Sequence, residues 1–205
     1  MYGRGAEMLP QQLLKKKMLV YGNSLSQGMS SHLAIDAYPW LLGRRLGYDV
    51  YNYALAGCCP IEQETVDFLT GFPEKFDLIL VEPSTNLFAR GFSTAEFERR
   101  CRRFLDTMTA CHPGVPIQCL NLFPSLFDCG FTGGELSVLP GKAGCCRFIL
   151  PTRACVPCAD QGAAGVAKFF GGSEMHPTSV GCFQIADRFL RELISLGIAE
   201  KVAEL

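Results

Sequence analysis

Short runs of consecutive apolar residues, each closed by turn-forming residues, recur along the chain. They cover residues 18–21, 50–55, 78–81, 117–122 and 166–170, and the last run is the least apolar. Runs of this length without polar alternation are typical of strands that are buried on both faces of a sheet. The pattern therefore predicts a sheet of five such strands.

Helical periodicity fills the stretches between these runs. A capping box at Ser93–Glu96 predicts a helix whose apolar stripe is Phe97, Cys101, Phe104, Met108 and Cys111. A last helix is predicted from Thr178 or Ser179 to a stop at Gly197, with an apolar stripe of Phe183, Ala186, Phe189, Leu190 and Leu193. Residues 39–46 predict a shorter helix.

The alternation of strands and helices indicates an α/β fold with a parallel sheet and right-handed crossovers. In such sheets ligands bind beyond the carboxyl ends of the strands. Segments with chemically suggestive residues follow the runs at 18–21, 50–55, 78–81 and 166–170. We therefore expect these segments to converge on one edge of the sheet.

Charge and hydropathy exclude several classes of function. The 205 residues carry a formal net charge of −1, which argues against a basic nucleic-acid surface. Four arginines lie largely outside the stripe of the helix after Ser93, and a solvated face is favoured over a nucleic-acid patch: Arg99, Arg100, Arg102 and Arg103. No apolar run approaches the roughly 20 residues of a membrane span.

The chain is predicted to form one domain over residues 17–205 after an N-terminal arm at 1–16. A basic run at 15–17 follows a weakly apolar stretch, the reverse of a secretion signal, so we expect a cytoplasmic chain. Residues 123–165 are rich in Gly, Pro and Cys and predict an insertion. A lid over the site and a solvated insertion both fit that segment.

Eleven cysteines are an odd number, and free thiols are expected in a reducing compartment. A structural zinc on Cys145, Cys146, Cys155 and Cys158 is the alternative, although the adjacent pair is not the usual second C-x-x-C. We expect no metal and no cofactor. The predicted partner is a small-molecule ester, and the oligomeric state stays open.

Four positions could carry nucleophilic chemistry. Ser24 follows the first strand, where its hydroxyl fits either a nucleophile or a helix cap. Gly57 and Asn86 follow the second and third strands and fit either donors to an oxyanion or plain turn residues. His176 precedes the last helix and fits a general base. His112 is interpreted as structural, and His32 as a possible substrate contact.

The order of these segments resembles the SGNH hydrolase superfamily, also called GDSL esterases or lipases. Its first block is similar to YGNSLSQG at 21–28, with Asn23 in place of the usual Asp. The second block is similar to residues 37–57, and PSTN at 83–86 falls where the family has Gly-x-Asn. EMHPTSVG at 174–181 is similar to the last block. The resemblance spans about residues 17–195.

The resemblance implies a three-layer α/β/α fold with a five-stranded parallel sheet in flavodoxin-like order. It implies Ser24 as nucleophile, His176 as base, and an oxyanion hole formed by the N–H groups of Ser24 and Gly57 and the Asn86 side chain. The activity would be hydrolysis of short acyl esters of small or carbohydrate-like alcohols through an acyl-enzyme. We expect Asn23 and His32 to contact the substrate.

One departure from the family pattern concerns the residue that orients the histidine. The family usually has an Asp three residues before the His, where this chain has Ser173. Glu174 or a backbone carbonyl is expected to take that role, because loss of the orienting acid lowers the rate strongly in Ser–His–Asp enzymes. Two alternatives to the esterase therefore stay open: a non-catalytic binding module and an acyltransferase on the same scaffold.

Overall fold

The computed structural model describes residues 14–83, 86, 91–120, 146–149 and 176–200. Five parallel strands form one sheet in the order β2-β1-β3-β4-β5. The strands are β1 (Lys16–Tyr21), β2 (Tyr48–Asn52), β3 (Leu78–Val81), β4 (Ile117–Leu120) and β5 (Cys146–Ile149). The predicted α/β fold with a parallel sheet is thus confirmed.

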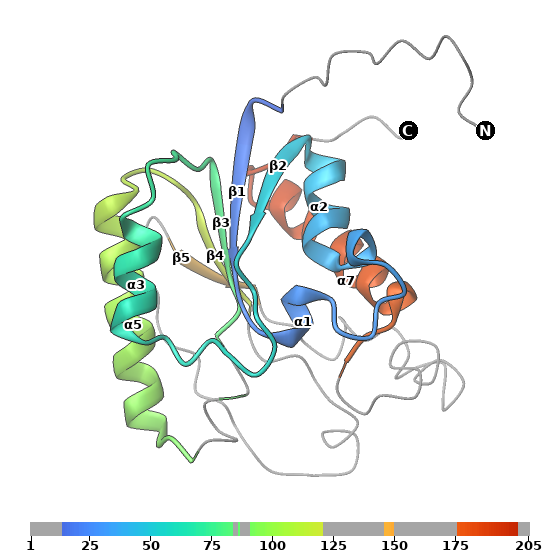
Figure 1. Ribbon diagram of the computed structural model, residues 1–205. Coiled ribbons are helices and arrows are strands. Elements are labelled where there is room, and N and C mark those ends of the chain that lie inside the picture. The colour runs from blue at the N-terminus through green and yellow to red at the C-terminus, as the bar shows by residue number, and fades with distance from the viewer. Residues whose placement is uncertain (1–13, 84–85, 87–90, 121–145, 150–175, 201–205) are drawn as a thin grey trace, which may run out of the picture.

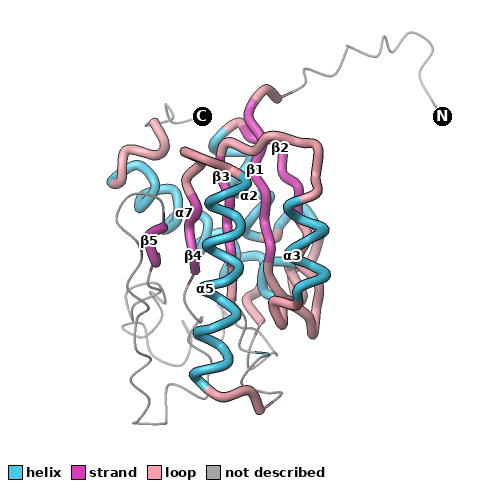
Figure 2. Tube along the Cα trace, turned by 90° about the vertical axis from the view of Figure 1, so that its left-hand side faces the viewer, coloured by secondary structure: helices cyan, strands magenta, loops and turns pink. Residues whose placement is uncertain are grey.

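Helices lie on both faces of this sheet. Figure 1 shows α2 (Tyr38–Leu46) and α7 (Ser179–Ser195) on one side, and α3 (Gln63–Thr70) and α5 (Thr94–Cys111) on the other. In Figure 2, α3 and α5 lie in front of the strands. The short helix α1 (Ser24–Gln27) and the 3₁₀ helix η1 (Ala34–Asp36) follow the carboxyl end of β1.

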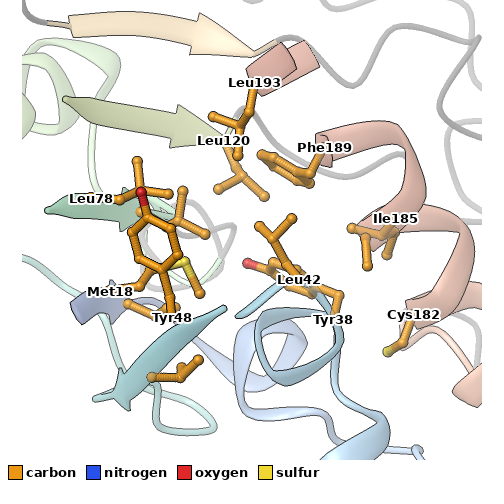
Figure 3. Close-up of a cluster of buried hydrophobic side chains, with 14 residues drawn as sticks. Met18, Tyr38, Leu42, Tyr48, Leu78, Leu120, Cys182, Ile185, Phe189 and Leu193 are labelled. Carbon is orange, nitrogen blue, oxygen red and sulfur yellow. The ribbon is translucent and has the colours of Figure 1, made fainter. Parts of the chain in front are cut away.

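Alternate residues of the central strands supply two separate cores. Met18 and Val20 of β1 pack against α2 and α7, in the cluster that Figure 3 shows, whereas Leu19 and Tyr21 pack toward α3 and α5. All four side chains are at most 3% exposed. Burial on both faces explains why the strand sequence is continuously apolar rather than alternating.

Both long helices begin where the sequence predicts. The Ser93 side chain accepts a hydrogen bond from the Glu96 N–H at 3.2 Å, and Thr178 caps α7 through the Gly181 N–H at the same distance. Gly197 follows the end of α7 with φ of +69°, a conformation that favours glycine. The start of α7 is therefore fixed locally, which positions the residues just before it.

Four details differ from the expectations. Strand β2 ends at Asn52 rather than at residue 55, and α3 was not anticipated. Phe183 is 50% exposed, because Cys182 and Ile185 fill the buried face of α7 instead. The strand expected at 166–170 lies outside the described residues, while β5 falls within the segment expected to be an insertion.

Candidate active site

Ser24 is the first residue of α1, two residues beyond the glycine that ends β1. The Asn23 side chain caps this helix by accepting the Leu25 N–H at 2.8 Å. Gly28, with φ of +89°, ends the helix after a single turn. The first N–H groups of a helix have no hydrogen-bond acceptor within the helix. The Ser24 N–H is one of these groups, so it makes no hydrogen bond within α1.

The structure brings the Ser24 hydroxyl and the His176 imidazole together. His176 Nε2 lies 2.8 Å from Ser24 Oγ, although the two residues come from opposite ends of the chain. His176 immediately precedes Pro177 and the Thr178 cap of α7, which sets its position. Burial lowers the pKa of His176 below its usual 6.5, so the ring is mostly neutral at pH 7 and can accept a proton.

The loop after β2, which carries Gly57, runs alongside the Ser24 turn. The Leu55 N–H donates to the Gly22 carbonyl at 3.2 Å, and the Ala56 N–H donates to Gln27 Oε1 at 2.7 Å. Gly57 is exposed and has φ of +70°, which an L side chain rarely adopts. The predicted donor is therefore attached to the same turn as Ser24.

Asn86 lies against this loop. Its Nδ2 donates to the Cys58 carbonyl oxygen at 2.9 Å. This hydrogen bond fixes the amide of Asn86 against Cys58, the residue that follows Gly57.

The same loop is held from its other side by α5. Cys59 and Ile61 have φ of +74° and +52°, conformations that are strained for residues with side chains. Arg100 donates to the Pro60 carbonyl at 2.7 Å, and Arg103 to the Ile61 carbonyl at 2.9 Å. The predicted solvated face is therefore only partly correct, because these two arginines stabilise a strained loop.

Three other predicted site residues have different outcomes. Glu174 lies outside the described residues. His32 is exposed, and its backbone N–H donates to Ser179 Oγ at 2.9 Å, near the start of α7. Asn23, which was expected to contact the substrate, is 1% exposed, and its side chain caps α1. Its contact with the substrate stays a prediction.

A buried carboxylate, which no sequence pattern had indicated, lies beneath the turn. Glu82 follows β3 and is 2% exposed. Its Oε2 accepts the Ser26 N–H at 3.2 Å and also the Ser26 hydroxyl, which lies 2.5 Å from the Tyr38 hydroxyl. The available signal was an acidic residue directly after an apolar strand, which we interpreted only as a turn.

Burial raises the pKa of Glu82 to about 7, because desolvation outweighs the hydrogen bonds from Ser26 and Asn23. An unfolded glutamate releases its proton near pH 4.5, whereas the folded protein keeps it until about pH 7. The unfolded state therefore binds fewer protons between these values, and stability falls as the pH rises.

We predict that the free energy of unfolding of the wild type falls, relative to Glu82→Gln, by on the order of 3 kcal/mol between about pH 4.5 and 7. Urea unfolding across this range measures it. The lowered pKa values of His112 and His176 act in the opposite direction, but equally in both proteins, so they cancel in the difference. Parallel curves for the two proteins would contradict the prediction.

The part of the chain that the structure describes contains neither a membrane-spanning helix nor a metal site. No helix there is long and apolar enough to cross a membrane. No group of three or more His, Cys, Asp or Glu side chains there is arranged to hold a metal ion. Of the four cysteines considered for zinc, only Cys146 falls within the described ranges.

Comparisons with solved structures find the same fold in other proteins. A GDSL-like lipase from Bacteroides ovatus is 18% identical with a TM-score of 0.63, over 93% of this chain and 56% of that chain. A salicylyl-acyltransferase from a tetracycline biosynthetic pathway is 18% identical with a TM-score of 0.61, over 92% and 56%. A family two carbohydrate esterase from Clostridium thermocellum is 14% identical with a TM-score of 0.62, over 93% and 67%.

The chain thus spans little more than half of the length of the first two of these proteins. Comparison with curated protein sequences gives no significant match. A family model does match, over residues 15–125, which is more than half of the chain and includes the Ser24 turn, the Gly57 loop and Asn86. By this match, the chain belongs to the GDSL-like Lipase/Acylhydrolase family.

Proposed function

We propose that this chain is a serine ester hydrolase on a three-layer α/β/α scaffold, acting on short acyl esters of small or carbohydrate-like alcohols. The observation that carries the proposal is the 2.8 Å distance between Ser24 Oγ and His176 Nε2. A hydroxyl becomes a useful nucleophile at neutral pH when an adjacent neutral base can take its proton. The membership of the family supports the same class of reaction.

In the proposed reaction, Ser24 Oγ attacks the ester carbonyl carbon and its proton moves to His176 Nε2. The carbonyl oxygen becomes negative, and we assign its stabilisation to the N–H groups of Ser24 and Gly57 and to the Asn86 amide. Such donors are effective where charge develops, and loss of one costs about 10²–10³ in rate. The hydrogen bonds from Leu55 and Asn86 support this assignment, because they tie the donor loop to the nucleophile turn.

When the tetrahedral intermediate collapses, His176 returns its proton to the departing alcohol and an acyl ester remains on Ser24. Water then attacks the carbonyl carbon of this ester, while His176 takes a proton from the attacking water. The acid is released and Ser24 regains its hydrogen. In this proposal the orientation of the imidazole is the role of Glu174 or of a backbone carbonyl.

A covalent probe and a simple ester together test this function. We expect the chain to hydrolyse 4-nitrophenyl acetate, and a fluorophosphonate to label it once, with mass spectrometry locating the adduct on Ser24. Labelling requires a nucleophilic serine beside a base, which a binding module on the same fold does not need. Absence of both labelling and turnover would leave the binding module as the better interpretation.

An acyltransferase is the second candidate, and the structural likeness to a salicylyl-acyltransferase supports testing it. The same acyl-enzyme would form, but an alcohol acceptor rather than water would attack it. Product analysis with added glycerol or a monosaccharide separates the two reactions. Transfer product in excess of free acid would favour the acyltransferase, and free acid alone would favour the hydrolase.

A further inference from the structure

The carboxylate of Glu82 receives hydrogen bonds from residues on both sides of Ser24. On the far side of Ser24, the Ser26 N–H donates to Oε2 at 3.2 Å and the Ser26 hydroxyl donates to the same oxygen. On the near side, interactions with the backbone and the side chain of Asn23 lower the pKa of this carboxyl and partly offset the effect of its burial. Glu82 therefore interacts with one residue before Ser24 and with one residue after it.

A second buried hydroxyl gives this network a direction. Tyr38 is 0% exposed, and its hydroxyl lies 2.5 Å from Ser26 Oγ. Burial raises the pKa of Tyr38 well above its usual value, so the phenol stays protonated. Because the Ser26 hydroxyl donates to Glu82, the Tyr38 hydroxyl is the donor in its hydrogen bond with Ser26 Oγ. The hydroxyl hydrogen of Ser26 is then directed to Glu82. Because these groups are buried, water offers no alternative partner to them.

Close packing couples the carboxylate to the backbone of the turn. A Cβ atom added to Gly22 would lie 2.8 Å from Ser26 Cβ and 3.0 Å from Glu82 Oε2. A side chain at this position would force Ser26 and Glu82 to shift, which favours glycine. The carboxylate thus packs close to the backbone at Gly22 as well as to Ser26, and a change at Glu82 alters the surroundings of both residues.

The orientation of this turn decides two elements of the proposed reaction. It sets the direction of Ser24 Oγ toward His176 Nε2, at 2.8 Å, and the direction of the Ser24 N–H. Displacement of a reacting group by about 1 Å can cost about 10²-fold in rate. A group that fixes the turn from both sides of Ser24 therefore affects the reaction without contacting the substrate.

We propose that Glu82 is a positioning residue, which holds the Ser24 turn in its reactive orientation through Asn23 and Ser26. This inference rests on the proposed function of Ser24. Beyond the residues of the proposed reaction, it assigns a role to a buried acid that contacts the nucleophile turn on its buried side. Ser26 and Tyr38 are the groups that orient this acid.

Glu82→Gln tests the role with little change in volume. Above about pH 7, where the assays are run, the wild-type side chain is a carboxylate whose Oε2 accepts both contacts from Ser26. A neutral amide is a weaker acceptor than a carboxylate, so it holds the turn less firmly. We expect kcat with 4-nitrophenyl acetate to fall about 10- to 100-fold, with KM within about twofold. The rate of labelling by a fluorophosphonate should fall by a similar factor.

Ser26→Ala removes only the hydroxyl contact and guards against failure of the first variant to fold. It should lower kcat about 3- to 10-fold, again with little change in KM. The matched control is Gln118→Leu, which alters a polar side chain of the neighbouring strand β4 that is also 2% exposed. Each kcat is divided by the number of sites that the fluorophosphonate titrates, and we expect the control to equal the wild type.

The outcomes separate this inference from the function on which it rests. If the wild type is neither labelled nor active, the proposed function fails. If the wild type is labelled but Glu82→Gln and Ser26→Ala keep kcat and labelling rate within twofold, Glu82 is merely structural, whatever happens to the melting temperature. If Glu82→Gln does not fold, Ser26→Ala decides between these results.

Discussion

Ser24→Ala should reduce hydrolysis of 4-nitrophenyl acetate to the rate of the buffer with free imidazole, a loss of about 10⁴-fold or more in kcat. The reason is that the substitution removes the oxygen that lies 2.8 Å from His176 Nε2. Fluorophosphonate labelling should disappear in the same variant. Steady-state kinetics and intact-mass spectrometry measure the two effects.

The fold should survive this substitution, because Ser24 makes its side-chain hydrogen bond to His176 rather than to the core. Alanine also has a high intrinsic preference for a helix, so a change in unfolding free energy below about 1 kcal/mol is expected. Ser31→Ala is the matched control, since it removes a nearby hydroxyl whose contact is Cys182 Sγ at 3.4 Å. Retention of more than a tenth of the activity in Ser24→Ala would exclude Ser24 as the nucleophile.

The elements that could be predicted from the sequence are those whose signal is local. The apolar run at 78–81 coincides with β3, and the capping residues Ser93 and Thr178 lie at the starts of α5 and α7. In each case the pattern and its physical cause lie within a few residues. The short helix α3 was not predicted, because only Val66 and Leu69 are buried in it. Two buried positions are too few to show a helical period in the sequence.

The apolar stripe predicted for α7 is confirmed at Ala186, Phe189 and Leu193, which are buried, but it is wrong at Phe183. Helical spacing placed Phe183 on this stripe, whereas Cys182 occupies the buried position and is 0% exposed. The Phe183 ring instead lies under the guanidinium group of Arg45 on α2, at 4.4 Å from its centroid. The burial of a small cysteine and the contact of Phe183 with a cation on another helix do not show in the local apolar pattern.

The candidate site shows the same division between local and distant causes. Ser24, Gly57, Asn86 and His176 could be proposed from the sequence because each follows a strand or precedes a helix at a predictable position. Glu82 was missed because its partner Ser26, and the Tyr38 hydroxyl that Ser26 contacts, lie far from it in the sequence. The contacts of Arg100 and Arg103 with the Gly57 loop likewise depend on how α5 packs. Long-range packing of this kind leaves no trace in hydrophobic periodicity.

His176→Gln should lower kcat by about 10³- to 10⁴-fold while KM changes little, because the amide keeps much of the volume but cannot accept the proton of Ser24. His112→Gln is the matched control. His112 is also partly desolvated. It lies between α5 and the amino end of β4, whereas Ser24 lies at the carboxyl ends of the strands, on the opposite side of the sheet. The kcat of His112→Gln should stay within about twofold of that of the wild type.

The double variant Ser24→Ala/His176→Gln is the sharper test of the pair. A base and a nucleophile that act as one unit are strongly non-additive, so the double variant should be no slower than Ser24→Ala alone. If the two losses instead multiply, each residue contributes independently, and the hydrogen bond of 2.8 Å between them is not the route by which the proton leaves Ser24. A non-additive result would identify that bond as the catalytic contact, because once the nucleophile is absent the base has no proton to take.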